Sequence, residues 1–245
     1  MITLQDKNIL VTGASSGIGR QIAITASELG AKLTIIGRNI QKLEETLALL
    51  AGDGHKIYVI DLSDAANLTS LISESTAYDG VVFNAGVVEY LPVKFLNENK
   101  INSVFATNFD SNVVLSQKLM KNKLLKKGGS LVFVSSISSK LGVPGTAMYT
   151  ASKAALSAFS KVLASELASQ GIRCNSVSPG IIKTAMTEQA AHVVSDEELK
   201  KAEAEYPLGY GQPEDVAGLI MYLLSDISKW MTGSDLVIDG GFTLK

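Results

Sequence analysis

A tyrosine and a lysine lie four residues apart at the start of an alanine-rich segment, in the sequence Tyr149-Thr-Ala-Ser-Lys153. On a helix this spacing places both side chains on one face. A phenol titrates near pH ~10 and is a poor acid-base catalyst at neutral pH, but a cation beside it favours the phenolate and lowers its pKa toward the working range. The pair therefore predicts a proton donor and its activator. A chance pairing on a solvated helix is the alternative.

A glycine-rich turn follows the first apolar run of the chain. The run ends at Val11, and Gly13, Gly17 and Gly19 come before a helical segment that ends near Leu29. Such a turn lets the backbone approach a pyrophosphate closely, and the free N–H groups at the start of the helix favour an anion. The spacing G-x-x-x-G-x-G differs from the common G-x-G-x-x-G fingerprint. A glycine-rich turn with no ligand is the alternative interpretation.

Apolar strands and helical segments alternate along the chain, which is typical of a parallel sheet covered by helices on both faces. The predicted strands are 8–11, 32–36, 56–60, 80–83, 130–135, 173–177 and 235–238. The predicted helices are 17–29, 40–50, 65–75, 99–122, 151–169 and 214–224. In such sheets a ligand lies outside the carboxyl ends of the strands, where one crevice would collect the side chains that follow them.

Several short motifs occur in a definite order along the chain, and most of them follow predicted strand ends. They are Thr12-Gly13-x-x-x-Gly17-x-Gly19, Asp61, Asn84-Ala85-Gly86, Asn108, Ser136, Tyr149-x-x-x-Lys153, and Pro179-Gly180 with Thr184. Together they resemble the short, single-domain branch of the short-chain dehydrogenase/reductase family, over nearly the whole chain. The resemblance implies an α/β, Rossmann-like doubly wound fold, with a seven-stranded parallel sheet and helices on both faces. It also implies one NADP(H)-binding catalytic domain over residues 1–245.

The end of the second predicted strand bears on the choice of cofactor. An acidic residue there would bind the adenosine ribose hydroxyls, whereas an arginine would pair with a 2′-phosphate. The sequence reads Ile36-Gly37-Arg38-Asn39, with no carboxylate, and the planar guanidinium of Arg38 suits a phosphate. We therefore expect NADP(H) to be preferred over NAD(H). The alternative is that Arg38 is a solvated loop residue.

The resemblance extends to the other cofactor contacts. It implies that Asp61 and Leu62 hold the adenine edge, that the segment from Asn84 lies beside the riboses, and that the segment from Pro179 binds the carboxamide end and the pyrophosphate. Asp61 could instead cap the next helix, and Asn84 could serve only a tight turn. The predicted cofactor-binding residues are Gly13, Ser15, Ser16, Gly17, Ile18, Gly19, Arg38, Asn39, Asp61, Leu62, Asn84, Ala85, Gly86, Tyr149, Lys153, Pro179, Gly180, Ile182 and Thr184.

Carbonyl reduction needs a hydride at the carbon and a proton at the oxygen as charge develops. By the resemblance, Tyr149 protonates the oxygen, Ser136 hydrogen-bonds it, and Lys153 binds the nicotinamide ribose. Only the resemblance selects Ser136 among the four serines at 135, 136, 138 and 139; the others could terminate the strand through local hydrogen bonds. Asn108 lies on an apolar helix face and needs a partner. The resemblance implies that it organises a relay water, and a structural amide clamp is the alternative.

The resemblance implies an NADP(H)-dependent oxidoreductase that acts on a carbonyl or alcohol. The pattern is similar to 3-oxoacyl-acyl-carrier-protein reductases, but the eight residues after Gly86 lack the Arg-Asp associated with that group. We expect a small-molecule or acyl-carrier-bound carbonyl substrate and a homo-oligomer, a homotetramer or a dimer. A non-catalytic NADP(H)-sensing or scaffold protein is the main alternative. A lyase or epimerase is disfavoured by the short chain.

Composition excludes other classes. The net charge of −2, without a basic cluster, predicts no binding of nucleic acid or anionic membrane. Cys174 is the one cysteine and fits a reducing compartment, and His55 and His192 form no ligand cluster, so we expect no metal. The chain opens without a basic targeting region, and no apolar run approaches the ~18 residues of a membrane span, which predicts a cytoplasmic protein.

Residues 186–210 form a weakly amphipathic segment between Thr184 and Pro213. Few large apolar side chains anchor it, and weakly anchored segments open readily. We therefore expect a mobile lid that sets substrate choice, with an ordinary pair of surface helices as the alternative.

Overall fold

The protein is described here as a computed structural model, which covers residues 1–64, 67–184, 187 and 196–244. Its centre is a seven-stranded sheet in the order β3-β2-β1-β4-β5-β6-β7, with every neighbouring pair parallel. The strands are β1 (Asn8–Thr12), β2 (Lys32–Gly37), β3 (Lys56–Val59), β4 (Tyr78–Phe83), β5 (Leu125–Val134), β6 (Arg173–Pro179) and β7 (Asp235–Ile238). The predicted fold class and the seven predicted strands are confirmed.

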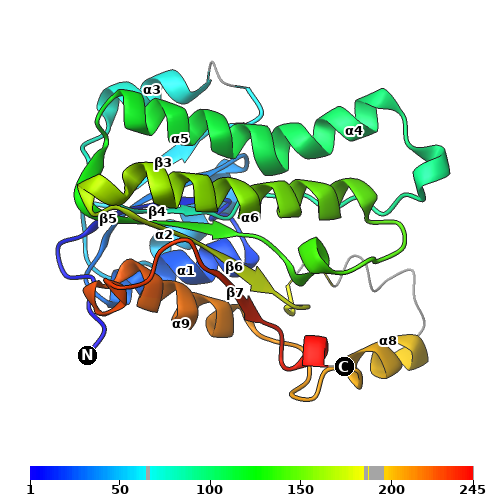
Figure 1. Ribbon diagram of the computed structural model, residues 1–245. Coiled ribbons are helices and arrows are strands. Elements are labelled where there is room, and N and C mark those ends of the chain that lie inside the picture. The colour runs from blue at the N-terminus through cyan, green and yellow to red at the C-terminus, as the bar shows by residue number, and fades with distance from the viewer. Residues whose placement is uncertain (65–66, 185–186, 188–195, 245) are drawn as a thin grey trace.

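Helices cover both faces of the sheet (Figure 1). On one face lie α1 (Gly17–Glu28), α2 (Ile40–Ala48) and α9 (Pro213–Leu224); on the other lie α3 (Leu68–Glu74), α5 (Ser111–Lys121) and α6 (Ala147–Leu167). α4 (Glu98–Phe105) precedes α5, and α8 (Asp196–Glu203) lies beside the C-terminal end of the chain (Figure 1). Short 3-10 turns are η2 (Val93–Phe95), η4 (Ile137–Lys140), η5 (Ala168–Gln170), η6 (Asp226–Ser228) and η7 (Phe242–Leu244).

Each central strand supplies side chains to two apolar cores, because successive strand residues point to opposite faces. In β1, Ile9 and Val11 join the core beneath α1 and α9, whereas Leu10 joins the core beneath α3, α5 and α6. The second core contains Phe83 and Phe133, whose stacked rings have centroids 4.2 Å apart. Full burial of each such side chain stabilises the fold by about 1.5–3 kcal/mol. The strands are therefore almost continuously apolar, as buried parallel sheets require.

The helix predicted over 99–122 is interrupted. A π-helical turn, η3 (Ala106–Asp110), separates α4 from α5, and Asn108 lies within it, fully buried. Such turns arise where one extra residue enters a helix, and they often occur at functional sites. The periodic sequence pattern over 99–122 gave no sign of the interruption.

The helix predicted to begin at residue 151 begins at Ala147 instead, with Thr146 at its N-cap position. The Thr150 N–H donates to Thr146 O at 2.8 Å, and the two threonine hydroxyls lie 3.0 Å apart, which closes the first turn. Tyr149 therefore lies inside the first turn of α6, and Lys153 lies one turn further along the same face.

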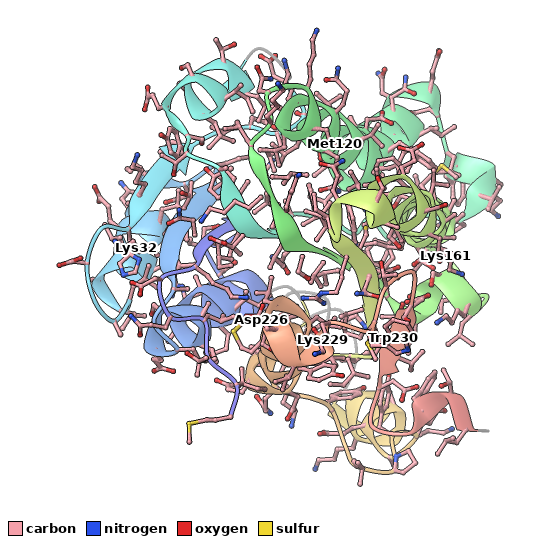
Figure 2. The ribbon with its side chains drawn as sticks, turned by 60° about the vertical axis from the view of Figure 1, so that its left-hand side comes forward. Lys32, Met120, Lys161, Asp226, Lys229 and Trp230 are labelled. Atoms are coloured by element: carbon pink, nitrogen blue, oxygen red, sulfur yellow. The ribbon has the colours of Figure 1, made fainter. Side chains whose placement is uncertain are left out.

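The surface between α9 and β7 carries Asp226, Lys229 and Trp230 (Figure 2), and Trp230 is 98% exposed. Cys174 is buried in β6, and burial raises the pKa of its thiol. Within the described residues, no helix has the length and apolar character needed to cross a bilayer.

Candidate active site

A cleft of about 610 Å³ opens at the carboxyl ends of the central strands. This is the edge at which doubly wound sheets bind their ligands. Most of the predicted site residues line it: Gly13, Ser15, Ser16, Gly17, Ile18, Arg38, Asp61, Leu62, Asn84, Ala85, Gly86, Ser136, Tyr149, Lys153, Pro179, Gly180, Ile182 and Thr184. Gly19, Asn39 and Asn108 are not among the lining residues.

The glycine-rich turn is shaped so that only glycine fits at its tightest points. Gly13 and Gly17 have φ of +66° and +53°, in the left-handed region that L side chains rarely adopt. A Cβ on Gly19 would lie 2.3 Å from Gly13 O and 2.4 Å from Asn84 Nδ2. The turn therefore presents bare backbone to the cleft at the start of α1, which fits the pyrophosphate of a dinucleotide.

Asn84 ties this turn to the end of β4. Its Nδ2 donates to Thr12 O and to Gly13 O, both at 3.2 Å, and its backbone N–H donates to Thr12 Oγ1 at 3.0 Å. The Ala85 N–H also donates to Thr12 Oγ1, at 3.1 Å. The side chain of Asn84 thus supports the turn, as the tight-turn alternative supposed, while the residue also lines the cleft.

The serines after β5 have different surroundings. Ser135 Oγ donates to Lys153 O at 2.9 Å and accepts from Ser157 Oγ at 2.8 Å, so Ser135 fastens α6 to the sheet. Ser136 precedes η4, and its Oγ accepts from the Ser138 N–H at 3.1 Å. Of the four serines, Ser136 is the one whose hydrogen bond affects the pKa of Tyr149. The structure therefore brings together the Ser136 and Tyr149 predicted from the sequence.

The pKa of Tyr149 is raised, not lowered. Burial raises it more than the hydrogen bond with Ser136 lowers it, and Tyr90 adds to the rise. Lys153 Nζ lies 5.8 Å from the centroid of the Tyr149 ring and donates to Val134 O at 2.7 Å. The prediction of a net lowered phenol pKa is thus wrong for this geometry, because burial dominates. Tyr149 holds its proton at neutral pH, which is the state a proton donor needs.

Lys153 is 4% exposed. Burial lowers the pKa of its ammonium to about 8. Gly86 passes close by, since a Cβ there would lie 3.3 Å from both Lys153 Nζ and Asn108 Oδ1. The absence of a side chain at Gly86 therefore lets its backbone pack closely against the lysine head and the Asn108 amide.

The side chain of Asn108 clamps the strand-end segment. Its Oδ1 accepts from the Val87 N–H at 2.8 Å, and its Nδ2 donates to Val87 O at 2.9 Å and to Ser152 Oγ at 3.1 Å. This pair of hydrogen bonds to Val87 matches the amide clamp considered as an alternative. The buried amide is thereby satisfied, as a polar group in an apolar setting requires.

The other end of the cleft holds Arg38 and Asp61. Asp61 Oδ1 accepts from Ser63 N at 3.0 Å and Ser63 Oγ at 2.6 Å; these bonds, and to a lesser degree the positive charge of Arg38, lower the pKa of its carboxyl. Asn39 Oδ1 instead accepts from the Lys42 N–H at 3.0 Å and caps α2. The side chain of Asn39 is thus used locally, and its predicted cofactor contact gains no support from it.

Three aromatic residues of the cleft wall were missed at the sequence level: Tyr90, Tyr206 and Phe242. Tyr206 is 6% exposed and stacks on Phe242, with ring centroids 4.4 Å apart. No spacing in the sequence connects residues so far apart. Residues 186 and 188–195 of the expected lid lie outside the described residues. The buried Tyr206 anchors the C-terminal part of the segment, and the mobile lid stays a prediction.

Known proteins resemble this chain in sequence and fold. Residues 13–243 match the family described as enoyl-(acyl carrier protein) reductase. The 3-oxoacyl-[acyl-carrier-protein] reductase FabG of Rickettsia prowazekii is 36% identical, covering 100% of both chains. D-threitol dehydrogenase of Mycolicibacterium smegmatis is 32% identical, covering 99% of this chain and 95% of its own. A short-chain type dehydrogenase/reductase from Mycobacterium marinum superposes with a TM-score of 0.88 at 31% identity, covering 100% of this chain and 98% of the other.

The parallel sheet, the glycine-rich turn and the cleft at the strand ends define a Rossmann-like protein whose cleft fits a dinucleotide. The match to reductases and dehydrogenases makes it an oxidoreductase. The chain belongs to the short-chain dehydrogenase/reductase family. Membership implies a nicotinamide cofactor, and the bare backbone of the glycine turn fits one.

Proposed function

We propose that the protein is an NADP(H)-dependent reductase of a carbonyl substrate. The observation that carries this proposal is the meeting of Ser136, Tyr149 and Lys153 on one wall of the cleft that also contains the glycine turn. When bound, a reduced nicotinamide supplies the hydride that a carbonyl carbon needs. A non-catalytic sensor on the same fold would have no use for a phenol hydrogen-bonded to a serine at this place.

The proton chemistry belongs to the side chains. Tyr149, neutral at pH 7, is the proton donor to the substrate oxygen, and Ser136 is a second donor that stabilises the negative charge developing there. Lys153 provides positive charge behind Tyr149 and stabilises it once the proton has left. Its ammonium would also bind the ribose hydroxyls of the nicotinamide. Asn108 holds the Val87 segment in place, and its part in a relay water remains a prediction.

The cofactor preference rests on Arg38. Its guanidinium is exposed at the adenosine end of the cleft, near Asp61. Arginine binds phosphate through two parallel N–H donors, whereas a ribose hydroxyl offers it no charge. We therefore propose a preference for NADP(H) over NAD(H), held by Arg38 beside the 2′-phosphate.

Replacing Arg38 with Ala should largely abolish the preference. A charge-assisted pair contributes ~1.5–3 kcal/mol, so the native protein should bind NADPH roughly ten- to 150-fold more tightly than NADH. Titration of both cofactors into both proteins measures this. Arg38→Lys, which keeps the charge without the planar fork, should give an intermediate ratio. Equal affinity of the native protein for the two cofactors would refute the assignment.

Lys153 should leave a signature in the pH dependence of stability. In the folded protein the pKa of Lys153 is about 8, below that of an exposed lysine. Between about pH 8 and 10.5 the unfolded state therefore binds more protons than the native state. The free energy of unfolding consequently increases as pH rises through this window. Lys153→Met removes this term. Relative to the variant, the native protein should therefore gain up to about 3 kcal/mol between pH 8 and 10.5. Urea unfolding of both cofactor-free proteins measures it; parallel pH curves would contradict the buried ammonium.

The substrate end of the cleft suits an uncharged carbonyl group, either free or carrier-bound. The segment after Gly86 contributes Val88 and Tyr90 to the wall, and Glu89 on this segment pairs with Lys100. Tyrosine and aliphatic side chains suit an uncharged, partly apolar substrate. Turnover of one 3-oxoacyl group, presented as a short free thioester and on acyl carrier protein, separates the two classes. The homo-oligomer and the cytoplasmic location stay predictions of the family resemblance.

A further inference from the structure

The turn that carries Ser136 ends in an ion pair to the edge of the sheet. η4 follows Ser136 directly and ends at Lys140, whose Nζ lies 3.0 Å from Asp235 Oδ2. Asp235 begins β7, the outermost strand of the sheet, and its side chain is 11% exposed. The pair therefore fastens the segment after β5 to a strand two positions away in the sheet.

The carboxylate is itself held in place from the neighbouring strand. Ser178, fully buried in β6, donates from its Oγ to Asp235 Oδ1 at 2.7 Å. Burial raises the pKa of Asp235, but the hydrogen bonds from Ser178 and Lys140 more than offset this and lower it. Asp235 is thus ionised and oriented at neutral pH, and it offers Lys140 a fixed partner.

The remaining polar contacts of η4 are local. The Ser138 N–H donates to Ser136 Oγ, Ser139 Oγ donates to Ser136 O at 2.7 Å, and the Leu141 N–H donates to Ser138 O. Among the described residues, Lys140 makes the side-chain polar contact that ties η4 to another element. Apolar packing of Ile137 is the other anchor of the turn.

We propose that Lys140 and Asp235 are positioning residues for Ser136. This inference rests on the proposed function of Ser136 as a hydrogen-bond donor to the substrate oxygen. Catalytic donors must be held closely, since a displacement of about 1 Å can cost up to ~10²-fold in rate. Without the ion pair, η4 keeps its local bonds but loses its tie to the sheet, and the Ser136 hydroxyl shifts relative to Tyr149.

The test compares Lys140→Met with Lys126→Met. Lys126 is a matched control, because it also pairs with an aspartate, Asp79, at 2.7 Å, and its side chain is 42% exposed against 39% for Lys140. We expect Lys140→Met to lower kcat about 5- to 20-fold with little change in cofactor affinity, and Lys126→Met to leave kcat near the native value. Lys140→Arg, which keeps the ion pair, should retain most of the native kcat.

A second background separates positioning from general loosening of the fold. If Lys140 acts through Ser136, Lys140→Met should slow the native enzyme but should not slow the Ser136→Ala enzyme further. Asp235→Asn, close to isosteric, repeats the test should Lys140→Met fold poorly. Two results would refute the positioning role, provided that Ser136→Ala itself is slow. In the first, Lys140→Met and Asp235→Asn keep a near-native kcat, as Lys126→Met does. In the second, they lower kcat by the same factor in the native and the Ser136→Ala enzymes. If Ser136→Ala itself turns over normally, the proposed function of Ser136 is wrong instead.

Discussion

Tyr149→Phe should lower turnover by at least ~10²-fold while leaving the fold intact. The change removes one hydroxyl and keeps the ring, its packing against the cleft wall and the position of Lys153. The phenol is neutral at pH 7, since its ordinary pKa is near ~10 and burial raises it further, so the native enzyme has a proton available at the substrate oxygen and the variant has none. Steady-state rates on a verified carbonyl substrate, together with the thermal midpoint of unfolding, measure both parts.

Cofactor binding distinguishes loss of the acid from damage to the site. Tyr149→Phe should bind NADPH nearly as well as the native protein. Lys153→Ala should lose both turnover and affinity if Lys153 serves both the phenol and the ribose, as proposed. Near-normal turnover of Tyr149→Phe would show that the proton takes another route.

Gly19→Ala should strongly disturb the glycine-rich turn and lower both stability and NADPH affinity. A Cβ at this position lies 2.3 Å from Gly13 O, so the backbone of the turn must move. Overpacking against a backbone of this kind costs about 1–3 kcal/mol or more of stability. The displaced turn can no longer meet the pyrophosphate, and NADPH affinity should fall with stability. Chemical unfolding and cofactor titration measure the two effects.

Gly218→Ala is the matched control for that change. Gly218 lies on the exposed side of α9, has an ordinary helical conformation, and a Cβ there meets nothing within 4 Å. Alanine in a helix interior is favoured over glycine by about 0.5–1 kcal/mol. The control should therefore be slightly more stable and should bind NADPH normally. A Gly19→Ala protein as stable as the native chain would contradict the tight geometry of the turn.

The sheet was predictable because strands buried on both faces are short apolar runs that carry their own signal. β7 was predicted to the residue, and other strand ends moved by at most a few residues, except that β5 begins earlier, at Leu125. The π-helical turn at Asn108 was not predictable, because it adds one residue within a pattern that stays apolar and periodic. The start of α6 was missed because Thr146 closes the first turn through its own backbone and hydroxyl.

The site could be predicted from the sequence because most of its residues follow a strand end, and parallel strands bring those ends together. The surroundings of each side chain could not be predicted from the sequence. The sequence placed a lysine beside a tyrosine and suggested a lowered phenol pKa, but burial dominates and raises it. Asn39 looked available to a cofactor, yet its side chain caps α2. Tyr206 and Phe242 carried no signal, because only the fold brings the C-terminal end to the cleft.

The central claim is that this cleft transfers hydride from a nicotinamide to a carbonyl carbon and a proton from Tyr149 to its oxygen. The most direct measurement incubates the protein with NADPH deuterated at the transferring position and a panel of small ketones and 3-oxoacyl thioesters. We expect loss of the reduced-nicotinamide absorbance matched by deuterium on the carbinol carbon of one product, at a rate that falls at least ~10²-fold in Tyr149→Phe. Tight NADPH binding with no labelled alcohol from any member of the panel, or label transfer unaffected by Tyr149→Phe, would contradict it.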